Sequence, residues 1–135
     1  MRSTPARVSI ALALLVAVAM TTAGLYAANR AGERTALAIK LTGGNPARAP
    51  HLMRHYGCAG CHTIPGVAGA DGLAGPPLSS LSQRVYIGGV LPNTPDNLLA
   101  WIVDPRAANP RTAMPVTGIA DQDARDVAAY LYSVR

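Results

Sequence analysis

The sequence predicts an all-α fold, in which a small helical domain follows an N-terminal transmembrane helix or signal segment. Residues 8–28 carry no charged side chain. Further along, apolar residues recur at the i, i+3, i+4, i+7 spacing of a helix face, and Pro and Gly stand where helices begin and end. No stretch shows the period-two alternation of a strand and no internal repeat is present, so no sheet is expected.

The apolar segment 8–28 is about long enough, at ~1.5 Å per residue, to cross ~30 Å of hydrocarbon as a helix. Two interpretations stay open: an uncleaved anchor, or a signal peptide removed after export. The anchor is favoured, because residues 21–23 offer only a poor cleavage site. Arg2 and Arg7 precede the segment and Arg30 follows it, so the distribution of positive charge does not indicate its orientation.

The chain is therefore expected to divide into an anchor or signal peptide over 1–29, a linker over 30–49 and a folded domain over 50–135. Gly and Pro are concentrated in the second half of the linker, which favours loop there. A short helical turn is expected at 35–40.

The first two helices of the domain are defined by their ends. A helix is predicted over 50–56, with Pro in its first turn and Gly57 at its exit. Glycine and proline make 66–77 a loop. A second helix is predicted over 95–103, because Leu98, Trp101 and Ile102 share one face and Pro flanks both ends.

The last helix is predicted over 121–133, after a loop at 109–118. Two aspartates lie at its positive end, where a negative charge is stabilising. A buried stripe is expected on the face formed by Ala124, Val127, Ala128 and Leu131.

Charge excludes nucleic acid as a partner. Residues 51–135 contain six arginines and six aspartates, so the sequence pI of about 9.8 reflects the N-terminal segment. A nucleic-acid-binding domain needs a basic face. The balance instead favours a mostly apolar contact patch, expected to involve Ile64, Val67 and 66–75.

The strongest motif is C-x-x-C-H, formed by Cys58, Cys61 and His62. In this motif each thiol adds to one vinyl group of a porphyrin, and the adjacent His is directed at the iron. It predicts one covalently bound haem c, with His62 as a metal ligand. Two other uses of a C-x-x-C pair, a redox dithiol and half of a zinc site, are disfavoured. No strand precedes the motif, and no second Cys pair could complete a zinc site.

A methionine opposite the histidine would complete the iron coordination. Met114 is the best candidate, because it lies in a loop restricted by Pro115. Met53 is too close to His62 along the chain to reach round the ring easily. His51 and His55 are the next candidates.

With these motifs in place, 51–135 resembles a class I cytochrome c, with a small helical fold around one haem. It is most similar to membrane-tethered mono-haem cytochromes and to the cytochrome c domains of haem–copper oxidases. Besides the pentapeptide, the likeness rests on Gly75-Pro76-Pro77-Leu78, on Trp101-Ile102-x-Asp104-Pro105, on the loop 110–115 and on Tyr130-Leu131.

The resemblance implies roles for further residues at the haem. The carbonyl of Pro76 would accept a hydrogen bond from His62, and Arg84 would pair with a haem propionate. Trp101 would pack beside the haem on the methionine side. The weaker candidates for hydrogen bonds to the propionates or near the methionine are Tyr86, Asn93 and Thr112.

The resemblance implies an electron-transfer protein rather than an enzyme. We expect a one-electron carrier of a respiratory chain, held in a bacterial cytoplasmic membrane by its N-terminal helix, with the haem domain on the periplasmic or outer side. After signal cleavage it would instead be soluble in the periplasm. The expected donor is a quinol-oxidising complex or a dehydrogenase, and the expected acceptor is a terminal oxidase. The alternative function is a haem enzyme or gas-binding sensor with an open or labile sixth iron position.

Overall fold

The computed structural model describes residues 5–135, with side chains from Val8 onward. Arg2 lies outside the described residues, as does the side chain of Arg7. The chain divides into two compact units, the first ending at Glu33 and the second spanning Arg34–Arg135.

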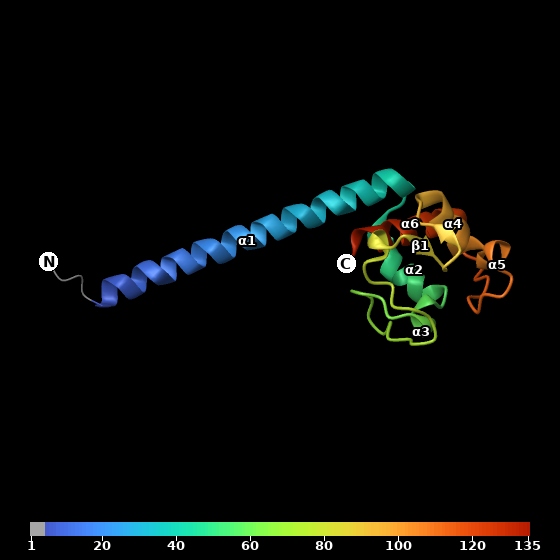
Figure 1. The fold of residues 1–135 in the computed structure, drawn as a ribbon, viewed down its shortest axis with the longest axis horizontal. Coiled ribbons are helices and arrows are strands. Elements are labelled where there is room, and N and C mark those ends of the chain that lie inside the picture. The colour runs from blue at the N-terminus through green and yellow to red at the C-terminus, as the bar shows by residue number, and fades with distance from the viewer. Residues whose placement is uncertain (1–4) are drawn as a thin grey trace. The chain divides into compact units, whose positions relative to one another are not determined.

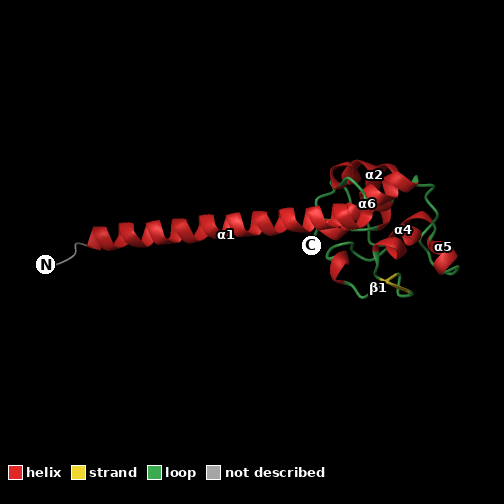
Figure 2. Cartoon of the chain, turned by 90° about the horizontal axis from the view of Figure 1, so that it is seen from above, coloured by secondary structure: helices red, strands yellow, loops and turns green. Residues whose placement is uncertain are grey.

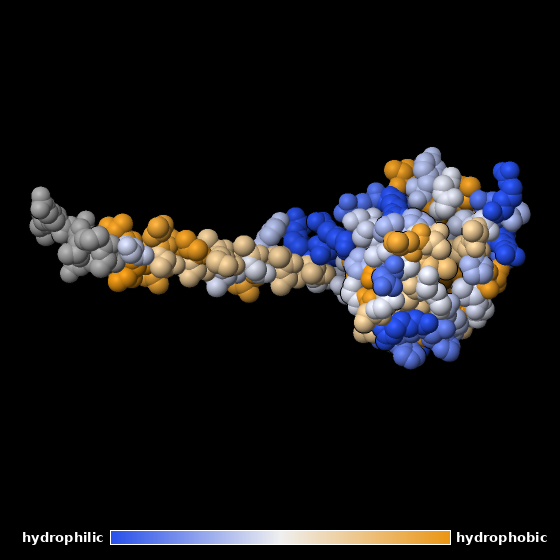
Figure 3. All heavy atoms as spheres, turned by 90° about the horizontal axis from the view of Figure 1, so that it is seen from below, coloured by the Kyte–Doolittle hydropathy of each residue, from blue (hydrophilic) through white to orange (hydrophobic). Residues whose placement is uncertain are grey.

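The first unit is helical throughout its described part and belongs to α1 (Pro5–Thr42). Its large apolar side chains are exposed, and they form the orange and tan surface of the helix in Figure 3. Val8–Thr42 is long and apolar enough to cross a membrane. Anchors and signal segments share this property.

The second unit begins inside α1, whose last turns bury Ala38 and Thr42. The segment expected as a linker is therefore helical as far as Thr42, and a short 3₁₀ helix (Pro46–Arg48) follows. The backbone N–H of Asn45 donates to Oδ1 of Asp126 across 2.7 Å. Residues 34–48 are thus largely ordered and hydrogen-bonded to the domain.

Three helices build the domain: α2 (Ala49–His55), α4 (Pro95–Val103) and α6 (Asp121–Ser133). Their bounds agree with the predicted helices to within one residue. Helix α6 contacts both of the others, as Figure 1 shows. The predicted stripe on α6 is buried, and it packs with Met53 and Leu98 in one aliphatic core.

The sequence patterns missed the shorter elements. They are α3 (Cys58–Cys61), α5 (Pro105–Ala108), a 3₁₀ helix (Leu81–Gln83) and a small hairpin of β1 (Tyr86–Ile87) and β2 (Leu91–Pro92), shown in yellow in Figure 2. Each strand has two residues, which are too few for an alternation of apolar and polar residues to be recognised in the sequence. Gly88 and Gly89 both have positive φ and form the turn.

The glycine-rich loop after α3 folds back on itself. Ile64 N–H donates to the carbonyl of Ala70, and the hydroxyl of Tyr130 donates to the carbonyl of Pro65. Ile64 and Val67 are 3% and 6% exposed. The expectation that these two side chains form a contact patch is therefore wrong, because they belong to the core.

Candidate cofactor site

A cavity of about 440 Å³ lies inside the domain, within the range of small-molecule and cofactor sites. Its wall is mostly apolar. Nine of the ten residues proposed from the sequence line it: Cys58, Cys61, His62, Pro76, Arg84, Tyr86, Trp101, Thr112 and Met114.

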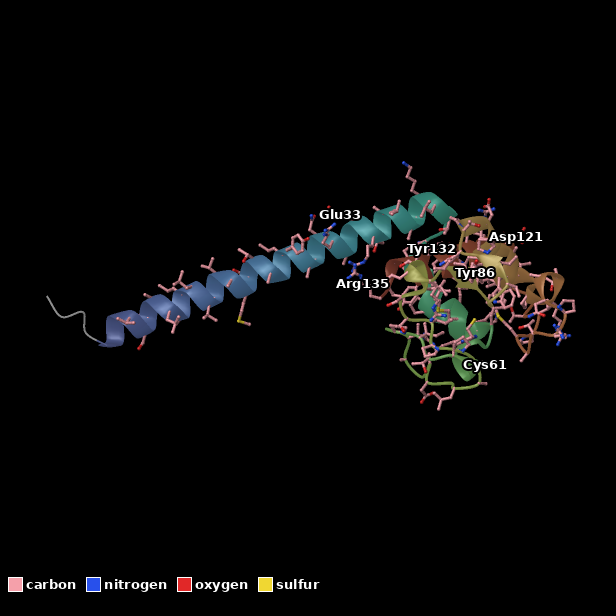
Figure 4. The ribbon with its side chains drawn as sticks, viewed as in Figure 1. Glu33, Cys61, Tyr86, Asp121, Tyr132 and Arg135 are labelled. Carbon is pink, nitrogen blue, oxygen red and sulfur yellow. The ribbon has the colours of Figure 1, made fainter. Side chains whose placement is uncertain are left out.

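The two thiols belong to the single turn of α3. Gly57 precedes this turn with φ of 80°, in the left-handed region that glycine tolerates. No disulfide joins the two cysteines; Cys58 is half-buried and Cys61 is exposed, and Figure 4 labels Cys61 on this turn. Burial raises the pKa of the Cys58 thiol.

His62 follows α3 directly, where the backbone changes from helical to extended. Its Nδ1 lies 2.7 Å from the carbonyl oxygen of Pro76. A carbonyl only accepts hydrogen bonds, so Nδ1 carries the proton and Nε2 keeps its lone pair for a metal. A Cβ on Gly75 would overlap the imidazole, with Nδ1 only 2.6 Å away. Glycine at 75 therefore makes room for the ring.

Met114 reaches the cavity from an irregular loop between α5 and α6. Its N–H donates to the hydroxyl oxygen of Thr112 across 3.2 Å, and the Thr112 N–H donates to the carbonyl of Asn109. Thr112 thus stabilises the methionine loop. Met53 also lines the cavity, but it is fully buried on α2 as part of the core.

Arg84 carries the one formal charge among the side chains that line the cavity. Its Nη2 donates to the carbonyls of Pro77 and Ser79. Nη1 and Nε have no hydrogen-bond partner among the described residues, so they are free to bind an anionic group.

Two aromatic side chains complete the wall on the hairpin side. Trp101 comes from α4 and is half-buried against the core. A Cβ on Gly88 would overlap the Trp101 ring, so glycine is required at this turn. Tyr86 lies on β1, and 57% of its surface is exposed.

Asn93 does not line the cavity, unlike the other proposed residues. Its side-chain nitrogen donates to the carbonyls of Leu81 and Arg84, and its oxygen accepts from the Tyr132 hydroxyl. A direct hydrogen bond from Asn93 to a bound group is therefore not available, because all three of its side-chain hydrogen bonds go to protein.

The side chains that line the cavity fit the donor chemistry of a haem site. Two thiols, an imidazole and a thioether converge on it, and a guanidinium stands at its wall. Imidazole and thioether are the axial ligands of cytochromes c. The described residues contain no cluster of three or more His, Cys, Asp or Glu that would hold a metal ion in another way.

A helical fold with a C-x-x-C-H turn at such a cavity defines a c-type haem protein. Comparison with known families agrees: the family model described as "Cytochrome c" matches residues 46–135, and the chain belongs to the cytochrome c family. This family transfers electrons through covalently bound haem c.

The chain is similar to a cytochrome c oxidase subunit 2 from Alkalihalophilus pseudofirmus. The two sequences are 35% identical over 85 residues. The match covers 62% of this chain but only 24% of the relative. No solved structure matches the chain.

Proposed function

We propose that this protein is a one-electron carrier anchored in a bacterial cytoplasmic membrane, which delivers electrons through one covalently bound haem c to a terminal oxidase. The observation that carries the proposal is the similarity to a cytochrome c oxidase subunit 2, together with the long apolar helix. When bound, the haem iron would supply reversible one-electron exchange.

The chain's own residues would hold and shield this group. Cys58 and Cys61 would bind it covalently, and His62 Nε2 and the Met114 sulfur would hold its iron. With the iron held by two side chains, no site would be left for a substrate or a gas. This favours electron transfer over the alternative of a haem enzyme or gas sensor.

The N-terminal helix would act as the anchor, with the haem domain on the periplasmic or outer side. The uncharged segment 8–28 has the length of a membrane span. The anchor predicts that the mature protein keeps its N-terminus and resists carbonate extraction. A mature N-terminus between Ala23 and Arg30 would instead identify a cleaved signal peptide.

The contact with the oxidase would be mainly apolar. Leu73, Val85 and Val116 are 88%, 73% and 51% exposed. Each is next in sequence to a residue that lines the cavity. Residues 51–135 contain six arginines and six aspartates, so this part of the chain has no net charge to steer it toward an acidic partner. A donor such as a quinol-oxidising complex or dehydrogenase would use the same exposed edge.

The proposal is tested by the oxidation rate of the reduced full-length protein, in detergent, with terminal oxidase solubilised from the same membranes. We expect rapid oxidation that falls less than about twofold as salt rises to physiological levels, where screening acts over ~8 Å. Leu73→Asp should slow the reaction. Ala68→Asp is the matched control, since it places the same charge on an exposed residue whose neighbours in sequence do not line the cavity. Absence of oxidation, with rapid carbon monoxide binding, would support the gas-binding alternative.

A further inference from the structure

Asn93 binds one short segment of chain through three hydrogen bonds. Its backbone N–H donates to the carbonyl of Val85 across 2.9 Å. Its side-chain Nδ2 donates to the carbonyls of Leu81 and Arg84, each across 2.8 Å. These contacts, which we name the Asn93 clamp, fix the backbone of residues 81–85.

Tyr132, at the end of α6, determines the orientation of the Asn93 side-chain amide. Its hydroxyl donates to Oδ1 of Asn93 across 2.8 Å. An amide oxygen only accepts and an amide nitrogen only donates, so this bond directs Nδ2 toward the two carbonyls. Figure 4 labels Tyr132 on α6 and Tyr86 on β1, the strand that directly follows the clamped segment.

The clamped segment forms one wall of the cavity, where Leu81 and Arg84 both lie. The Arg84 guanidinium in turn binds the carbonyl of Pro77. Pro77 follows Pro76, whose carbonyl holds the His62 ring. A continuous set of contacts therefore runs from the C-terminal helix to the cavity's only cationic side chain and ends beside its histidine.

We propose that Tyr132 and Asn93 are positioning residues, which hold the Arg84 guanidinium at the cavity wall and so adjust the reduction potential of the bound haem. The proposal rests on the proposed haem function of the cavity. A guanidinium held nearby disfavours the oxidised form, which carries one more positive charge, so it raises the potential. Loosening the clamp lets the cation move away, and the potential falls.

The test compares the reduction potentials of full-length variants in detergent, each first checked for covalent haem by a haem stain of the denatured protein. Arg84→Gln removes the cation and should lower the potential. Asn93→Ala and Tyr132→Phe should lower it by a smaller amount. Asn97→Ala is the matched control: Asn97 binds the neighbouring carbonyl of Pro92 but not residues 81–85, and its loss should leave the potential unchanged.

The decisive comparison is made in the Arg84→Gln background. There, Asn93→Ala and Tyr132→Phe should cause no further shift, because the group they position is already absent. An equal shift in both backgrounds would overturn the proposal, as would no shift in the parent protein or the same shift in the Asn97→Ala control.

Hydrogen exchange at the Asn93 backbone amide is a second readout, which does not depend on the reduction potential. Loss of the Tyr132 hydroxyl leaves Oδ1 of Asn93 without its donor, which should speed hydrogen exchange at the Asn93 amide by about tenfold. Unchanged exchange would contradict the clamp. If Asn93→Ala yields no haem protein, the nearly isosteric Tyr132→Phe carries the test. A wild-type protein without haem would instead disprove the proposed function.

Discussion

The carbonyl oxygen of Pro76 lies 2.7 Å from Nδ1 of His62, fourteen residues earlier in the chain. This contact determines the tautomer of the imidazole, with the proton on Nδ1 and the lone pair on Nε2. It depends on Gly75, because any Cβ at that position would overlap the ring. The orientation of the proposed iron ligand is thus set by a loop rather than by a helix.

Gly75→Ala should therefore disturb the site more than its small size suggests. The added methyl group would displace either the imidazole or the loop, so we expect at least about a tenfold loss of haem-containing protein, the equivalent of ~1.4 kcal/mol. Yield is measured by haem absorbance per unit of total protein. Ala68→Ser, an exposed change in the same loop, should be neutral. Equal yields for Gly75→Ala and wild type would contradict the role of Gly75.

Met114→Ala should remove the sixth ligand and expose the iron. The weak near-infrared band of sulfur-to-iron charge transfer should disappear, the reduction potential should fall, and carbon monoxide should bind rapidly to the reduced protein. Met53→Leu, a core substitution of similar volume, should keep the band. If Met114→Ala leaves the spectrum unchanged, the ligand lies elsewhere, with His51 and His55 the next candidates.

Asp126 should matter for stability although it does not line the cavity. Its side chain is fully buried, and it accepts hydrogen bonds from Asn45 N–H and, across 2.6 Å, from Arg48. Asp126→Asn removes the negative charge of the group that accepts these hydrogen bonds. We therefore expect a loss of about 1–3 kcal/mol in the free energy of unfolding. Asp121→Asn, exposed on the same helix, should cost only a few tenths. Thermal unfolding of the haem-loaded variants measures both, and equal losses would refute the role of Asp126.

Alkaline pH should destabilise the fold partly through Tyr132. Burial raises the pKa of Tyr132 to about 12, above its value of ~10 in an unfolded chain. The folded state then holds this proton more tightly, so the associated stability is complete below pH ~10 and is lost as the pH rises toward ~12. Tyr132→Phe should lose stability less steeply across this window in chemical denaturation. Identical slopes for the two proteins would exclude Tyr132 as a contributor.

The three main helices and most of the candidate site residues could be predicted from the sequence. Proline and glycine mark the ends of α2 and α4, and the apolar stripe of α6 is regular enough to identify its buried face. The C-x-x-C-H motif and Met114 identified residues that the fold brings to one cavity, because their chemistry is specific even without a structure.

The remaining features depend on contacts between distant residues, which local patterns do not contain. Asn93 was expected at the cofactor, yet its partners are Tyr132 and the carbonyls of residues 81–85. Ile64 and Val67 look like loop residues but belong to the buried core, against which Tyr130 packs. The segment 34–48 lacks a strong helical pattern, and its order comes from Asp126 and Arg125 on α6.

The central claim is that Cys58 and Cys61 hold one haem covalently at this cavity. The most direct test is the intact mass of the denatured full-length protein after acid–organic extraction. Covalent attachment predicts a mass equal to the polypeptide plus one haem in the wild type, and a sharply reduced yield of that species when either cysteine is replaced by Ala. A wild-type protein whose haem extracts freely, leaving the mass of the bare polypeptide, would contradict it.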